Sequence, residues 1–151
     1  MVSQHNPIRI FVSHLWEADD DYLRVFEFLE SARNFYYTNL SKPDRRPSGG
    51  KEAEREELRA QIAQAEVVVL LASHHRRGAE LVEFEANFAK AADKPLIVLT
   101  SFGGTGAISK ALLGIADETL DWDERALTDA IRRQARHEET TRWDTIEFKL
   151  D

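Results

Sequence analysis

The glutamate at position 85 stands out because it lies on the apolar face of a helical pattern. At about 100° per residue, residues 78–93 place Leu81, Val82, Phe88 and Ala89 beside Glu85, whereas the charged residues fall on the opposite arc. None of these neighbours is a cation that could pair with the carboxylate. An unpaired carboxylate costs several kcal/mol to bury, and such placements concentrate at functional sites. The pattern therefore marks Glu85 as a candidate functional residue; the alternatives are that its side chain reaches solvent at the edge of the stripe or accepts a hydrogen bond from a distant backbone N–H.

Two serine–histidine pairs follow apolar, strand-like runs. Ser13 and His14 come directly after the first run, and Ser73 and His74 follow a later one. In open α/β sheets, ligands bind outside the carboxyl ends of the strands. We therefore expect Ser13, His14 and Ser73 to contribute to a binding site at that edge.

Other motifs are better explained without a ligand. The adjacent His74 and His75 diverge in direction and have no His-x-x-x-His spacing, so we expect surface or loop histidines rather than metal ligands. The acids at 19–21 suit a helix N-terminus. The glycine-rich run 103–110 lacks the ending of a P-loop and follows the fourth strand, so neither a P-loop nor a Rossmann fingerprint is predicted. A receiver-type phosphotransfer domain would need acids where the two serine–histidine pairs stand.

Short apolar runs predict buried parallel strands, and amphipathic segments predict the helices between them. Strands are expected at 8–12, 67–71 and 95–99, with weaker ones at 35–37 and 118–121. Helices are expected at 19–33, 51–64, 78–93 and from 123 to about 138, with a short one near 109–113. This alternation predicts an α/β fold with a five-stranded, parallel, doubly wound sheet.

Two connections are longer or richer in glycine than simple turns. Residues 38–50 contain two prolines and two glycines, and residues 101–106 contain three glycines. Such loops in a compact domain are often lids or binding loops, so we expect residues 38–50 to be mobile and to become ordered on contact with a ligand or partner. A last edge strand is expected at 145–150.

The composition predicts one globular domain spanning residues 1–151. The chain has no cysteine, which excludes thiol nucleophiles and disulfides and makes a cytoplasmic location the expected one. Its 20 basic and 27 acidic residues give a net charge of −7, which disfavours nucleic acid, although backbone N–H groups and one or two arginines could still hold a dinucleotide. The apolar run at 8–12 is too short for a signal peptide or a membrane span, so no membrane partner is expected.

Several segments together resemble the bacterial TIR-like domains. Residues 11–14 (Phe-Val-Ser-His) resemble the opening strand motif, and residues 35–43 (Phe-Tyr-Tyr-Thr-Asn-Leu-Ser-Lys-Pro) resemble the segment after the second strand. The third strand, the helix with Glu85 and residues 94–98 follow in the order and spacing of that subgroup. The resemblance covers about residues 8–133, is best to the TIR-like component of Thoeris anti-phage defence systems, and implies a flavodoxin-like fold.

This resemblance implies an enzyme that uses NAD as a substrate, with no cofactor and no metal. Members of the family that are active release nicotinamide and form ADP-ribose or a cyclic isomer, which signals to a downstream effector. The family's catalytic glutamate corresponds to Glu85, its first-strand aromatic and serine to Phe11 and Ser13, and its second-segment asparagine to Asn39. The resemblance makes Phe11 and Tyr37 candidates for the apolar wall of the substrate site and Asn39 a candidate for positioning the ribose or nicotinamide. Leu81 is also a candidate for substrate binding, although the family often has tryptophan where this chain has Leu81 and Tyr37.

The implied chemistry needs no general acid, because nicotinamide leaves NAD as a neutral ring. A carboxylate such as Glu85 would instead stabilise the oxocarbenium-like ribosyl centre. The resemblance also implies a homo-oligomer, since TIR domains commonly complete their active sites across protomers. Two alternatives stay open: a nucleoside deoxyribosyltransferase-like enzyme, which also breaks an N-glycosidic bond with a glutamate, and a catalytically silent TIR scaffold that acts by protein–protein contacts.

Overall fold

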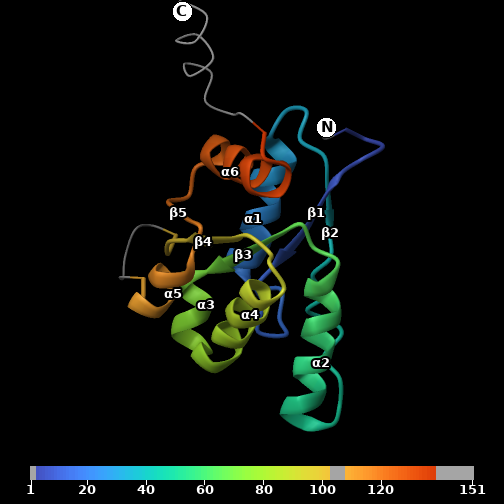
Figure 1. Cartoon of the computed structure of the whole chain (residues 1–151), viewed down its shortest axis with the longest axis vertical. Helices are drawn as coiled ribbons and strands as arrows, with labels where there is room; N and C mark the ends of the chain where they lie inside the picture. The colour runs from blue at the N-terminus through green and yellow to red at the C-terminus, as the bar shows by residue number, and fades with distance from the viewer. Residues whose placement is uncertain (1–2, 103–107, 139–151) are drawn as a thin grey trace, which may run out of the picture.

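The protein is built around one sheet of five parallel strands. The computed structural model describes residues 3–102 and 108–138 (Figure 1). The strands are β1 (Ile8–Val12), β2 (Tyr37–Asn39), β3 (Val67–Leu71), β4 (Leu96–Leu99) and β5 (Glu118–Leu120), paired in the order β2-β1-β3-β4-β5. The prediction of a five-stranded, parallel, doubly wound α/β fold is confirmed.

Helices connect the strands and begin where the sequence provides caps or special backbone conformations. They are α1 (Asp20–Ser31), α2 (Gly50–Ala63), α3 (Ala72–Arg77), α4 (Ala79–Ala91), α5 (Lys110–Ile115) and α6 (Glu124–Arg136). The carboxylate of Asp19 caps α1 by accepting from Tyr22 N–H, and that of Asp123 caps α6 in the same way. Gly49 precedes α2 with φ 118°, a left-handed conformation that glycine adopts without strain.

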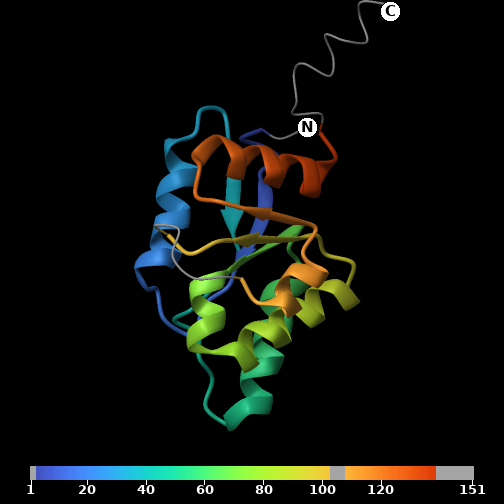
Figure 2. The same ribbon diagram turned by 90° about the vertical axis from the view of Figure 1, so that its left-hand side faces the viewer.

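The helices cover both faces of the sheet and create two apolar layers. On one face, α1 and α6 pack against the alternate residues Ile8, Ile10 and Val12 of β1. On the other, α2, α4 and α5 pack against Phe11 and its neighbours in β3 and β4. Figure 2 shows α6 on one side of the strands and α3, α4 and α5 on the opposite side. The central strands β3 and β4 are buried on both faces, which explains their continuous apolar sequences, whereas the edge strands β2 and β5 are partly exposed.

The second strand begins two residues later than the sequence pattern predicts. Asn34 adopts a left-handed conformation after α1, and Phe35 packs into the core before pairing begins. The register aligns Ile8 with Tyr37 and Ile10 with Asn39, so pairing with β1 sets the position of β2. The expected edge strand at 145–150 and most of the glycine-rich loop at 101–106 lie outside the described residues.

A short helix, α3, also occurs where the sequence analysis expected only a loop. It follows β3 directly and makes a sharp junction with α4 at Gly78. Within residues 3–102 and 108–138, no helix is long and apolar enough to cross a membrane.

Candidate functional site

The strand order places a natural ligand site between β1 and β3. From β1 the chain moves outward to β2 on one side, and then crosses back to β3 on the other, so the connections diverge at this point. In doubly wound folds, the crevice outside the carboxyl ends of such strands is where ligands bind. Here the segment after β1 faces the junction of α3 and α4.

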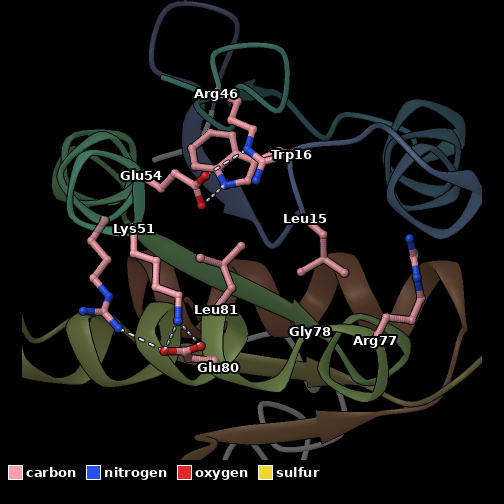
Figure 3. Close-up of a pocket in the computed structure, with 10 residues that line it drawn as sticks. Leu15, Trp16, Arg46, Lys51, Glu54, Arg77, Gly78, Glu80 and Leu81 are labelled. Atoms are coloured by element: carbon pink, nitrogen blue, oxygen red, sulfur yellow. Dashed lines mark hydrogen bonds and ion pairs between the residues drawn. The ribbon is translucent and has the colours of Figure 1, made fainter. Parts of the chain in front are cut away.

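A pocket of about 240 Å³ occupies this switch point (Figure 3). It is enclosed by the segment after β1, the beginning of α2 with the loop before it, and the beginning of α4. Its lining residues are Leu15, Trp16, Arg46, Lys51, Glu54, Arg55, Arg77, Gly78, Glu80 and Leu81. Figure 3 shows Leu15 and Leu81 between the charged groups, so the pocket has an apolar centre and a charged rim.

Glu85 lies one turn beyond Leu81 on α4 and is completely buried. Neither of its carboxylate oxygens has a hydrogen-bond partner within the described part of the chain. Burial raises the pKa of Glu85 well above its ordinary value, and the nearby backbone N–H of His14 opposes this rise to a smaller extent. Burial therefore favours the neutral, protonated form of this carboxyl group.

This arrangement excludes one of the two structural alternatives for Glu85. Its exposed fraction is 0%, so the side chain does not reach solvent. The second alternative is met only weakly: the backbone N–H of His14 approaches the carboxyl group and acts to lower its pKa, but it is too poorly aligned to satisfy either oxygen. A buried acid without a partner is destabilising, and it can respond strongly to a positive charge brought next to it.

Ser13 belongs to a buried chain of polar groups that links three elements. Its Oγ lies 3.0 Å from Nδ1 of His74 and accepts a hydrogen bond from the Leu71 N–H. Nε2 of His74 lies 3.0 Å from both carboxylate oxygens of Asp19. Because a carboxylate can only accept, Nε2 carries the proton. Burial acts to raise the pKa of Asp19, but hydrogen bonds from Tyr22 N–H and His74 outweigh it and lower the pKa.

The expectation that His74 is a surface or loop residue is therefore wrong. His74 lies in α3 with none of its surface exposed, because Ser13 and Asp19 provide partners for both ring nitrogens. His75, its neighbour, points elsewhere and pairs with Glu83 at 2.8 Å. No group of three or more potential metal ligands occurs among the residues that the structure describes.

His14 is also buried. Burial lowers its pKa to about 4, against the opposing effect of a hydrogen bond with Gln61. Nδ1 of His14 accepts from the Trp16 N–H at 3.3 Å, so Nε2 carries the proton and donates to Oε1 of Gln61 at 3.0 Å. Its ring also lies 5.6 Å from that of Phe11, which is buried in the same layer as α4. His14 and Phe11 thus lie in the structure that supports the pocket.

Tyr37 and Asn39 lie in the other layer, away from Glu85. The ring of Tyr37 stacks on Phe26 of α1, and its hydroxyl donates to Glu30 at 2.6 Å. The amide of Asn39 donates to the Tyr22 hydroxyl and accepts from Ser41 N–H. The structure therefore does not bring these two side chains to the pocket, because both point from β2 toward α1.

Ser73 makes a local contact at the beginning of α3. Its hydroxyl donates to Asp21 of α1 at 2.7 Å. Of the eight site residues predicted from the sequence, Leu81 lines the pocket, and Glu85, Phe11, Ser13 and His14 lie in the structure behind it. The roles of all eight in binding or catalysis remain predictions.

The sequence analysis did not identify Trp16, and it anticipated the charged rim only in expecting that one or two arginines could hold a dinucleotide. Trp16 adopts a left-handed conformation with φ 60°, which is rare for a bulky residue and which occurs most often at functional sites. Its indole N–H donates to Glu54 at 3.2 Å, and its ring packs edge-on against His14 at 4.9 Å. The sequence signal was weak because Trp16 and Glu54 are 38 residues apart in the chain.

The fold and the candidate site together define the class of protein to which this chain belongs. A parallel sheet of order β2-β1-β3-β4-β5, with a pocket at the switch point and a buried glutamate on the helix beside it, is a flavodoxin-like α/β domain of the TIR-like type. Comparison with known families identifies the particular one: residues 11–102, well over half of the chain, match the family described as Thoeris protein ThsB, TIR-like domain, and the chain belongs to this family. The matched range contains all eight predicted site residues. No curated protein matches the chain.

Membership of this family supports a TIR-domain role in anti-phage defence.

Proposed function

We propose that this protein cleaves NAD at the bond between nicotinamide and ribose, with Glu85 as the catalytic carboxylate. The observation that carries the proposal is the buried, unpartnered carboxyl group of Glu85 beside the pocket at the switch point. Family membership supports the proposal, because NAD cleavage is the activity that resemblance to TIR-like domains implies.

The chemistry requires a negative charge next to a developing positive one. Nicotinamide in NAD is a pyridinium, and its departure leaves an oxocarbenium-like ribosyl centre. A cationic ring beside Glu85 would lower the pKa of the carboxyl group and favour its ionised form. The carboxylate would then stabilise the positive charge through an apolar surround of low dielectric, where such interactions are strongest.

NAD cannot reach Glu85 without movement of the side chains above it. The carboxyl group is fully buried, and a volume of about 240 Å³ is below the roughly 300–1,000 Å³ that is typical of ligand pockets. Leu15 and Leu81 form the apolar centre of the pocket, so we propose that they separate when the nicotinamide end enters. The product, ADP-ribose or a cyclic isomer, would then be the signal to an effector.

The test is to incubate the purified protein with NAD and to separate the products by chromatography. The parent should release nicotinamide, and Glu85→Gln should reduce turnover by roughly 10²- to 10³-fold or more, as for single electrostatic groups in other active sites. Glu83→Gln is the matched control, since Glu83 lies two residues away on α4 and faces His75 instead of the pocket. The retention time of the second product distinguishes ADP-ribose from its cyclic isomers.

Other outcomes would identify a different function. Cleavage of free nucleosides in preference to NAD would favour the deoxyribosyltransferase-like alternative. Self-assembly without loss of NAD would favour the TIR scaffold. Near-parent turnover by Glu85→Gln would contradict the proposed role of Glu85.

A further inference from the structure

The rim of the pocket is more basic than the protein as a whole. The chain carries a net charge of −7, yet four of the ten lining residues are cations and two are carboxylates. The cations are Arg46, Lys51, Arg55 and Arg77. A local excess of positive charge in an acidic protein indicates an anionic ligand or an internal anion that occupies the same place.

Two of the four cations are held by shielded carboxylates. Arg77 donates to Asp19 at 2.6 Å, and Arg46 donates to Glu54 at 2.9 Å. The side chains of Asp19 and Glu54 are each only 17% exposed. Asp19 is further fixed by Tyr22 and His74, and Glu54 by Trp16. These two arginines are therefore part of the pocket wall.

The other two cations share one exposed carboxylate. Lys51 and Arg55 of α2 both contact Glu80 of α4, at 3.2 Å and 3.3 Å, and the Glu80 side chain is 65% exposed. Ion pairs this long and this exposed contribute at most about 1 kcal/mol, because water screens them. Figure 3 shows Glu80 at the rim, with its carboxylate toward Lys51. A stronger anion could therefore displace Glu80 at low cost.

The backbone around Glu80 adds to the positive potential. Both α2 and α4 begin at the pocket, and neither has a side chain that caps its first turn. The N–H groups and dipole of a helix N-terminus favour negative charge, and Glu80 supplies that charge from the first turn of α4. Two helix ends and two weakly held cations thus surround one exposed carboxylate.

We propose that Lys51 and Arg55 bind the diphosphate of the dinucleotide, and that Glu80 forms ion pairs with both residues until the substrate displaces it. This inference rests on the proposed function for the identity of the ligand. Glu80 and Glu85 are five residues apart on α4, which is about 7.5 Å along the helix axis. Leu81, which lies between them on the surface of α4, would then contact the ribose.

The test measures binding of ADP-ribose by calorimetry, because this probe carries the diphosphate and has no nicotinamide to lose. Lys51→Ala and Arg55→Ala should each weaken binding by about tenfold, as expected for a lost contact to a charged group. Arg59→Ala is the matched control. Like Arg55, Arg59 lies on α2 over the ring of Phe84, and it pairs with glutamates, but it does not line the pocket. Thermal unfolding of each variant checks that the fold is retained.

The most discriminating variant is Glu80→Gln, which should bind ADP-ribose about two- to fivefold more tightly than the parent because the competing charge is removed. Glu83→Gln, which makes the same change away from the pocket, should bind like the parent. Affinity of the parent should fall as salt rises, since the cations are exposed.

Unchanged affinity in both Lys51→Ala and Arg55→Ala, weaker binding by Glu80→Gln, or a parent that binds no ADP-ribose would each overturn the inference. Binding of ADP-ribose that depends on Lys51 and Arg55, in a protein that leaves NAD intact, would support this site and refute the proposed cleavage.

Discussion

At the scale of single residues, burial shifts the pKa values of the neighbouring Glu85 and His14 toward their neutral forms. Burial raises the pKa of the Glu85 carboxyl group and lowers the pKa of the His14 imidazole to about 4. His14 is compensated, because both ring nitrogens have hydrogen-bond partners. Glu85 has no such partner in the described part of the chain, so it lowers the stability of the fold at neutral pH.

The first prediction is that the loss of folding stability caused by burying Glu85 depends on pH. The ordinary pKa of the glutamate is 4.5, and its value in the folded protein is well above this. Between these two values, the unfolded chain has released a proton that the folded protein retains. The parent should therefore lose stability as pH rises above 4.5, by about 1.4 kcal/mol per pH unit from this group, until pH passes the folded pKa.

Glu85→Gln removes this pH-dependent loss of stability. The variant and the parent should therefore differ little in free energy of unfolding below pH 4.5, and the variant should become increasingly more stable than the parent as pH rises. Urea unfolding from about pH 5 to about pH 8 measures the difference. An advantage that stayed constant over this range, or a less stable Gln variant at the upper end, would mean that Glu85 is ionised and satisfied in the folded protein.

At the scale of elements, one histidine joins the end of β1, the beginning of α1 and the helix after β3. His74 contacts Ser13 and Asp19, and Asp19 in turn holds Arg77 at the rim of the pocket. The chain of contacts positions the segment after β1 relative to α3, and these segments form part of the pocket wall.

The second prediction is that His74→Ala destabilises the fold by about 2–4 kcal/mol. It leaves a buried cavity and deprives Ser13 and Asp19 of a partner each. His75→Ala should cost less than about 1 kcal/mol, because its contact with the half-exposed Glu83 is weak. Urea unfolding of the two variants gives a direct comparison, and equal losses would mean that the buried chain has no special role.

The third prediction concerns the connection between β2 and α2. Its first part is anchored, because the Gln61 amide accepts from Lys42 N–H and donates to the Lys42 carbonyl oxygen. Its last part carries Arg46, which lines the pocket. We therefore expect residues 43–50 to gain protection from hydrogen exchange when NAD or ADP-ribose binds, whereas Lys42 changes little. Strong protection of the whole connection in the free protein would argue against gating.

At the scale of the whole molecule, we propose that self-association opens the pocket beside Glu85, whose carboxyl group is fully buried in the single chain. Contact with a second copy would displace the side chains above the pocket, and the free energy of that contact would offset the free energy needed to open it. Leu23, Phe102 and Leu113 are large apolar residues, each about half exposed, that could be buried by such a contact.

The fourth prediction is that NAD turnover per protomer rises with protein concentration. If assembly opens the site, activity should increase faster than linearly and should fall on dilution. Sedimentation at the same concentrations checks that the gain follows assembly. A specific activity that is constant across a wide dilution series would show that a single chain is sufficient.

Much of the architecture follows from the sequence itself. The apolar runs of β1 and β3 and the amphipathic pattern of α4 depend on local periodicity, so the elements and their parallel arrangement were predictable. The same periodicity placed Glu85 on the buried side of α4. That inference needed no knowledge of what packs against the helix, because a stripe of leucine, valine, phenylalanine and alanine must face the core.

Only the tertiary structure determines which partner each polar side chain contacts. His74 is buried because Ser13 and Asp19, each more than fifty residues away in the chain, supply partners for its ring. Tyr37 faces α1 instead of the pocket because its register with Ile8 sets the direction of its side chain. Periodicity reports which face of an element is buried, but hydrogen bonds and ion pairs form between elements, and their partners are fixed only when the sheet brings distant segments together.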